Sequence, residues 1–140
     1  MNPGDVVLQR NSFSDPFSIL IWVRSHRYGH CGVYIGQGKM IACDLLQGGV
    51  CLQDAGASDS HSVPVSWDFN AVLSWLTEQL DARKKYDLWA WVRILFGLRS
   101  DCPGDRFTCS SLVGEALTRF AGKRCYRETT PDEIAALLSA

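Results

Sequence analysis

The feature that most constrains the fold of this chain is a change in hydrophobic period after Trp67. Before this residue, apolar residues come in short runs bounded by glycine-containing turns, which is typical of β-strands. After it, apolar residues recur every three or four positions, which is typical of amphipathic helices. A chain of 140 residues has room for one ordinary domain. We therefore expect a single α+β domain over 1–140, with strands first and helices after.

The first half predicts short strands and one helix. Apolar runs at 5–8 and 50–52 indicate strands, and the compact run at 17–23 indicates a short helix. Two longer runs flank Gly36-Gln37-Gly38, which is typical of a β-hairpin. The small polar segment at 54–62 predicts a surface loop.

The second half predicts helices over 71–80, 86–98 and 108–120, and a last one that begins at Pro131. Thr130 and Glu133 have the spacing of a capping box, with proline at the first helical position. The segment 86–98 is apolar on nearly every side. We expect it to be a buried helix, with an exposed substrate or partner surface as the alternative.

Charge and hydropathy exclude several kinds of partner. The chain has 14 Lys+Arg against 15 Asp+Glu, and its largest basic cluster is 83–85, so we expect no nucleic-acid partner. Its longest apolar stretch is interrupted by Arg93 and is shorter than the ~20 residues of a membrane span. The N-terminal sequence MNPGDVVLQR lacks the features of a secretory signal, so we expect cytoplasmic synthesis.

The six cysteines include no Cys-x-x-Cys pair, and several lie in apolar runs. This pattern favours reduced thiols in a reducing compartment over disulfides, and we expect no zinc site and no cofactor.

Cys109 is the candidate nucleophile. It lies in the predicted first turn of the 108–120 helix, where free N–H groups and the helix dipole favour a thiolate and an oxyanion. It also shares a helical face with Leu112, Val113 and Ala116, so an ordinary core position is the alternative.

His30 is the candidate base, because it opens a strand beside Gly32, which leaves room for a helix or a substrate. His26 and His61 lie in polar segments, where we expect them to be exposed. A three-residue hairpin loop would place Asp44 across from His30 as an orienting carboxylate. A two-residue loop at 37–38 would shift the register and remove Asp44 from that face.

These residues resemble a known family. The stretch 29–36 (GHCGVYIG), with 38–41 after it, resembles the His-bearing hairpin of NlpC-type papain-like cysteine hydrolases, and 107–113 (FTCSSLV) resembles their nucleophile helix. The order of His before Cys is similar to the circularly permuted branch, which also includes lecithin:retinol acyltransferase-like enzymes. Further similarity lies at 4–7, 86–87 and 130–132.

The resemblance implies a papain-like fold, with a small antiparallel sheet or partial barrel packed against helices. It implies a bacterial or phage cysteine peptidase or amidase in which Cys109 attacks a carbonyl and His30 transfers the proton. The usual substrate of such enzymes is peptide of the cell wall. Without a signal of its own, such a protein would reach the periplasm or wall through a phage particle, lysis or a secretion assembly.

Two departures from the family pattern leave alternatives open. The residue twelve positions after His30 is Ala42, where NlpC-type enzymes usually carry a third polar residue. Asp44 is the natural substitute, but a dyad, a different third residue or an inactive interaction module also fits. The nucleophile motif is Thr-Cys-Ser-Ser rather than Asn-Cys-Glu-His, which disfavours the other alternative, a lipid thioesterase or acyltransferase.

Overall fold

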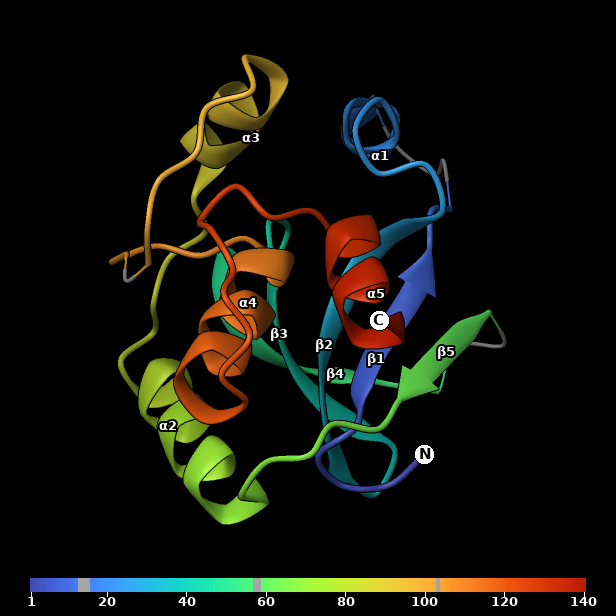
Figure 1. The fold of residues 1–140 in the computed structure, drawn as a ribbon, viewed down its shortest axis with the longest axis vertical. Coiled ribbons are helices and arrows are strands. Elements are labelled where there is room, and N and C mark those ends of the chain that lie inside the picture. Colours follow the sequence, from blue (N-terminus) through green and yellow to red (C-terminus); the bar gives the residue numbers. More distant parts are fainter. Residues whose placement is uncertain (13–15, 57–58, 103) are drawn as a thin grey trace.

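The computed structural model describes residues 1–12, 16–56, 59–102 and 104–140. These residues form an α+β structure in which one antiparallel sheet of five strands, in the order β4-β3-β2-β1-β5, is packed against helices (Figure 1). The strands are β1 (Val6–Arg10), β2 (Tyr28–Gly36), β3 (Lys39–Asp44), β4 (Gly49–Asp54) and β5 (Ser60–Val63). The helices are α1 (Pro16–Trp22), α2 (Phe69–Asp81), α3 (Leu88–Leu95), α4 (Cys109–Phe120) and α5 (Pro131–Ser139).

The main core lies between the sheet and α4, which packs on β2 and β3. Leu112, Val113 and Ala116 of α4 are fully buried there, so the expected apolar face of this helix is confirmed. Helix α5 also packs on β2, and its expected capping box is present, with Thr130 accepting from the N–H of Glu133. Within the described residues, no helix has both the length and the hydrophobicity of a membrane span.

The hairpin between β2 and β3 combines the two predicted alternatives. Its loop has two residues, Gln37 and Gly38, both with positive φ (54° and 72°), as a type I′ turn requires. The pairing nevertheless follows the three-residue register, with Gly32 opposite Ala42. An irregularity between Tyr34 and Gly36 absorbs the extra residue, so the strand keeps the faces of the three-residue register.

The prediction of a loop over 54–62 is wrong at both ends, since Asp54 is the last residue of β4. Residues from Ser60 onward form β5, which pairs with β1 and closes the sheet on that side; residues 57–58 lie outside the described part of the chain. Serine and histidine have weak strand propensity. Residues 60–63 therefore form a strand because their backbone pairs with β1. Since β1 is distant in sequence, the local pattern of 60–63 does not predict this strand.

The prediction of a buried helix over 86–98 is also wrong. Helix α3 covers only 88–95, because Asp87 caps its N-terminus and accepts a hydrogen bond from the N–H of Ala90. Trp91 and Ile94 face the core, whereas Trp89 is 71% exposed. A helix that is apolar on all sides carries no sequence signal for which face is covered.

Candidate active site

Cys109 is the first residue of α4, and its backbone position is set by the residue before it. The Thr108 side chain accepts a hydrogen bond from the N–H of Ser111, and the Ser111 hydroxyl accepts one from the N–H of Thr108. This capping box leaves the N–H groups of Cys109 and Ser110 without partners within the helix. The positive end of the helix dipole therefore lies at the Cys109 sulfur.

Contacts distant in sequence hold the start of α4 against the end of β3. Phe107 forms a parallel bridge with Tyr86, and its carbonyl accepts a hydrogen bond from the N–H of Asp87 (2.8 Å). The same carbonyl accepts one from the Cys43 thiol (3.0 Å). These contacts bring Cys109 to the sheet, next to β2.

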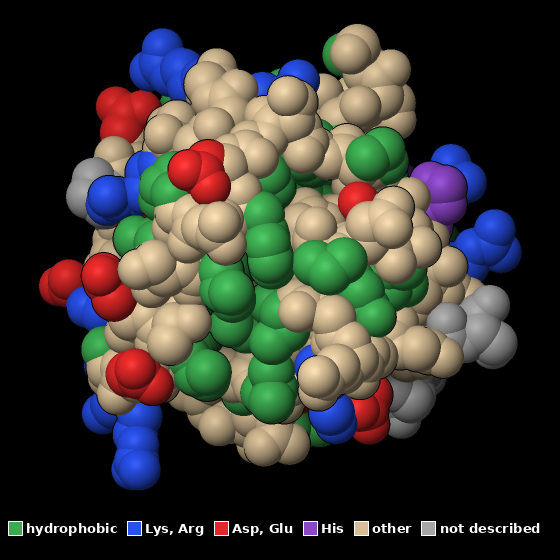
Figure 2. All heavy atoms as spheres, turned by 90° about the horizontal axis from the view of Figure 1, so that it is seen from below, with side chains coloured by type: hydrophobic (Ala, Val, Ile, Leu, Met, Phe, Trp, Pro, Cys, Tyr) green, Lys and Arg blue, Asp and Glu red, His purple; other side chains and the backbone are tan. Residues whose placement is uncertain are grey.

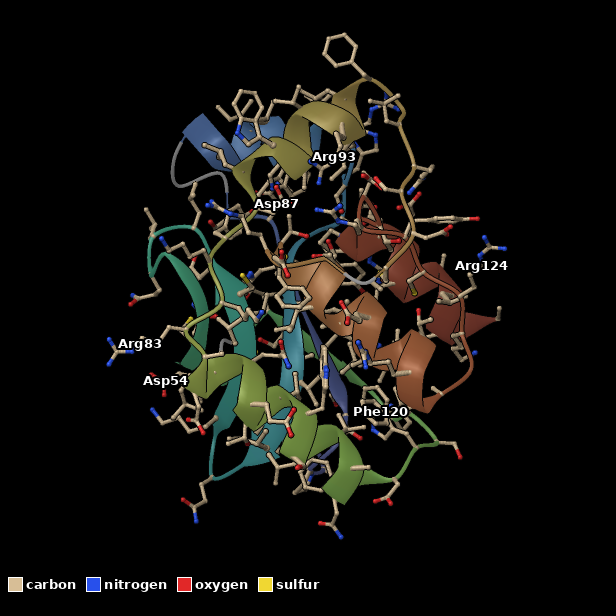
Figure 3. All side chains as sticks on the ribbon, turned by 90° about the vertical axis from the view of Figure 1, so that its left-hand side faces the viewer. Asp54, Arg83, Asp87, Arg93, Phe120 and Arg124 are labelled. Carbon is tan, nitrogen blue, oxygen red and sulfur yellow. The ribbon has the colours of Figure 1, made fainter. Side chains whose placement is uncertain are left out.

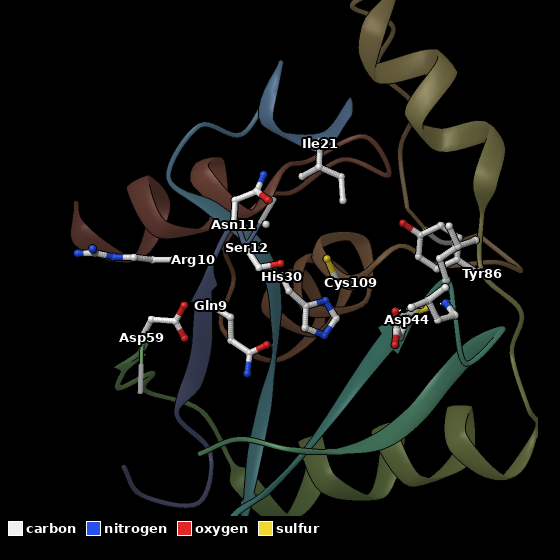
Figure 4. Close-up of a pocket in the computed structure, with 14 residues that line it drawn as sticks. Gln9, Arg10, Asn11, Ser12, Ile21, His30, Asp44, Asp59, Tyr86 and Cys109 are labelled. Atoms are coloured by element: carbon white, nitrogen blue, oxygen red, sulfur yellow. Dashed lines mark hydrogen bonds between the residues drawn. The ribbon is translucent and has the colours of Figure 1, made fainter. Parts of the chain in front are cut away.

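The structure brings Cys109 and His30 together, as the sequence predicts (Figure 4). Burial lowers the pKa of His30, but hydrogen bonds with Cys109 and Gln53 outweigh burial and raise it to about 9. The pKa of Cys109 lies well below its ordinary value, because hydrogen bonds from the thiol of Cys31 and from His30 stabilise the thiolate. These opposite shifts describe a thiolate and imidazolium pair at neutral pH.

Cys31 contributes to the site from the core. It lies next to His30 on β2, and its side chain is fully buried. Burial raises the pKa of its thiol well above the ordinary value, so the group stays protonated. A protonated thiol in contact with Cys109 is a donor to the thiolate, a role that strand alternation does not reveal.

Gln53, which we did not predict, makes the contact with His30 that we expected of Asp44. The Gln53 Oε1 lies 2.7 Å from His30 Nε2, which leaves Nδ1 to face Cys109. The Gln53 Nε2 in turn donates to Asp44 Oδ2 (2.9 Å). Asp44 thus reaches the imidazole through Gln53, and its charge still favours the imidazolium. Ala42 is fully buried opposite Gly32 and makes no contact of this kind with the imidazole.

The Cys109 sulfur and the His30 ring open on a cavity of about 330 Å³, which we call the Cys109 pocket (Figure 4). Gln9 and Ser12 line one side, and Tyr86 lines another. Trp91 donates a hydrogen bond to the Tyr86 hydroxyl (2.6 Å), and burial raises the pKa of this phenol. Tyr86 therefore presents a neutral polar group to the pocket.

The space expected beside Gly32 is not available to a substrate. A Cβ at this position would lie 2.8 Å from the carbonyl oxygen of Ile41 and 3.0 Å from the sulfur of Met40. The glycine therefore allows β3 to approach closely. The other two histidines, His26 and His61, are exposed as expected.

The six cysteines are all free thiols, and all lie in the described part of the chain. Among the described residues, no group of three or more His, Cys, Asp or Glu side chains is placed to hold a metal ion. Comparison with protein-family models and with curated proteins finds no match to this chain.

Proposed function

We propose that this protein is a papain-like cysteine hydrolase that cleaves an amide bond, with cell-wall peptide as the substrate class. The observation that carries the proposal is the pairing of Cys109, at the start of α4, with His30 on β2 inside one pocket. A nucleophile and a base in contact, with the base hydrogen-bonded to a third group, are the elements of nucleophilic catalysis. The cell-wall substrate and the papain-like fold rest on the sequence resemblance.

The geometry supports a conventional acyl transfer. The Cys109 thiolate attacks the carbonyl carbon, and the N–H groups at the start of α4 stabilise the oxyanion that forms. The His30 imidazolium donates its proton to the leaving amine, so that the C–N bond breaks and an acyl-enzyme remains. Neutral His30 then takes a proton from water, the hydroxide attacks the thioester, and the thiolate leaves.

Alkylation by iodoacetamide across pH, read at each cysteine by mass spectrometry, tests the chemistry. We expect Cys109 to react far below the pKa of an ordinary thiol, and the His30→Ala variant to lose this reactivity. Cys51 is an internal control, because burial raises the pKa of its half-exposed thiol. If Cys109 titrates near ~8.5 in both proteins, the proposal is wrong.

Product analysis tests the substrate class. Wild-type protein and the Cys109→Ala variant are incubated with murein peptides and, separately, with lipid acyl esters. Release of a new amine from the peptides, by the wild type alone, supports the proposal. The exposed apolar side chains of α3 favour lipid acyl hydrolysis as a second candidate, and turnover of the esters alone would establish it. Turnover of neither substrate, with ordinary Cys109 reactivity, would indicate an interaction module.

A further inference from the structure

The exposed hydrophobic side chains concentrate on two helices that lie far apart in sequence. Helices α1 and α3 project from the same end of the molecule in two perpendicular views (Figures 1 and 3). With the residues that follow them, they carry eight of the exposed large hydrophobic side chains, which we call the apolar rim: Ile19, Trp22, Val23, Leu88, Trp89, Val92, Phe96 and Leu98. Trp89 and Phe96 are the most exposed of these, at 71% and 78%.

The opposite end of the molecule is different. Hydrophobic side chains are visible there too, in the middle of the face seen in Figure 2. Helix α2 lies at this end (Figure 1), but none of its large hydrophobic residues is among the exposed ones, and Leu73 and Leu80 pack against the core. Exposed hydrophobic side chains gathered at one end of a protein commonly mark an interaction site.

The apolar rim borders the Cys109 pocket. Ile21 of α1 lines the pocket, as does Tyr86, which precedes α3 by two residues (Figure 4). The Arg24 guanidinium donates a hydrogen bond to the carbonyl of Leu95 (2.9 Å) and so joins the end of α1 to the end of α3. Whatever covers the rim therefore lies against the opening of the site.

Buried charges hold α3 with its apolar side outward. Arg93 points toward Asp87 at the base of the helix (Figure 3), where it pairs with Asp87 (2.6 Å) and with the fully buried Glu128 (2.8 Å). Rotating α3 to cover Trp89 would break both ion pairs and leave the charge of buried Glu128 with hydrogen bonds from Ser100 but without the Arg93 cation, at a cost larger than the burial of one aromatic ring. The exposure of the rim is thus part of the fold.

The charge on the two segments has one sign. Residues 16–27 and 88–99 hold four of the 14 Lys+Arg and none of the 15 Asp+Glu of the chain. Arg93 and Arg99 are paired with acidic side chains from elsewhere. Arg24 and Arg27 are exposed beside α1, and the guanidinium contacts with a carbonyl and with the Tyr28 ring do not neutralise them. The half-buried Asp132 carboxylate lies beside Arg27, where it accepts a hydrogen bond from the backbone N–H (3.1 Å) rather than from the guanidinium.

We propose that the apolar rim docks on the surface of an anionic lipid bilayer. Tryptophan, phenylalanine and aliphatic side chains are favoured at the boundary between headgroups and acyl chains, and arginines beside them bind lipid phosphates. A second copy of this chain would cover the same apolar area, but it would bring like charges together across a two-fold interface. Docking places the opening of the Cys109 pocket at the lipid surface, independently of the chemistry of Cys109.

Flotation with lipid vesicles tests the docking, and the Cys109→Ala variant of the full chain is used so that turnover plays no part. We expect it to bind vesicles of phosphatidylcholine containing phosphatidylglycerol, with a blue shift of tryptophan emission, and to bind phosphatidylcholine alone far more weakly. Adding Trp89→Glu and Phe96→Glu should weaken binding more than about tenfold, since both rings leave the interface. Adding Arg27→Gln should weaken binding to the anionic vesicles about fivefold, and high salt should also weaken this binding.

The matched control adds Ser74→Glu and Thr77→Glu, which place the same two charges on exposed positions of α2. We expect this protein to float like its parent. Absence of flotation with either vesicle, or equal flotation of the rim and α2 variants, would overturn the proposal. The proposal would also be overturned if the parent protein does not float but forms a concentration-dependent dimer, and the Trp89→Glu and Phe96→Glu changes abolish that dimer. Because Cys109 is absent from all these proteins, the result is separate from the alkylation test of the proposed function.

Discussion

Replacing Gln53 by methionine removes the link between His30 and Asp44 while keeping the length of the side chain. The wild-type amide makes two hydrogen bonds, at 2.7 Å to His30 Nε2 and at 2.9 Å to Asp44 Oδ2. A hydrogen bond to a charged group contributes about 1.5–3 kcal/mol, which corresponds to about 1–2 pKa units. The pKa of His30, raised to about 9 in the wild type, should therefore fall to about 7–8 in the variant.

The loss should also be visible at Cys109, because a less stable imidazolium stabilises the thiolate less. The pH profile of Cys109 alkylation is expected to shift upward in Gln53→Met, and the pKa of His30 can be followed directly by NMR. Asp44→Asn, which keeps an acceptor for the Gln53 amide but removes the charge, should produce a smaller shift. Gln79→Met is the matched control, since Gln79 lies on α2 and lines neither of the cavities that His30 lines, so it should leave both profiles unchanged.

Two results would refute this reasoning. If Gln53→Met leaves both profiles where the wild type has them, Gln53 does not stabilise the imidazolium. If Asp44→Asn shifts the pKa of His30 more than Gln53→Met does, the carboxylate acts on the ring directly and not through the amide.

Two further predictions concern stability. The raised pKa of His30 and the lowered pKa of Cys109 mean that the unfolded chain binds more protons than the native site below pH 6.5, the ordinary value for histidine. Above pH 6.5 the two states bind equal numbers of protons, because native His30 and an unfolded cysteine both lose a proton near pH 9. Stability from this pair should therefore be constant above pH 6.5 and fall as the pH drops below it. It is measured as the difference in unfolding free energy between wild type and Cys109→Ser, and a difference that does not fall in acid contradicts the pair. Glu128→Gln should lower the unfolding free energy by about 3 kcal/mol in urea titrations, because it breaks a buried ion pair. Asp54→Asn, which removes an exposed ion pair with Lys39, should lower the unfolding free energy by less than about 1 kcal/mol. Equal losses in the Glu128→Gln and Asp54→Asn variants would contradict the conclusion that burial makes the Glu128 ion pair the more important one.

The candidate site shows what local pattern can predict. A thiol in the first turn of a helix and a histidine at the start of a strand are local features, and both were visible in the spacing of the chain. Whether Asp44 lies on the same strand face as His30 depended on the hairpin register. The sequence left this register undecided, because a two-residue turn with a bulge and a three-residue loop give the same pairing. Gln53 carries no signal at all, since one glutamine in a strand does not differ from another until β4 is placed beside β3.

Sequence alone determined the order of strands and helices apart from β5, the first turn of α4, the capped start of α5, and the two residues, Cys109 and His30, on which the proposed chemistry depends. These follow from hydrophobic period and capping, which act between neighbours along the chain. Only the tertiary structure decided that 60–63 is a strand, that Gln53 contacts the imidazole, and that Cys31 contacts the nucleophile. It also decided which side of α3 is exposed. The helix is apolar on nearly all sides, and the ion pairs of Arg93 with Asp87 and Glu128 hold one side toward the core, so the other side faces solvent.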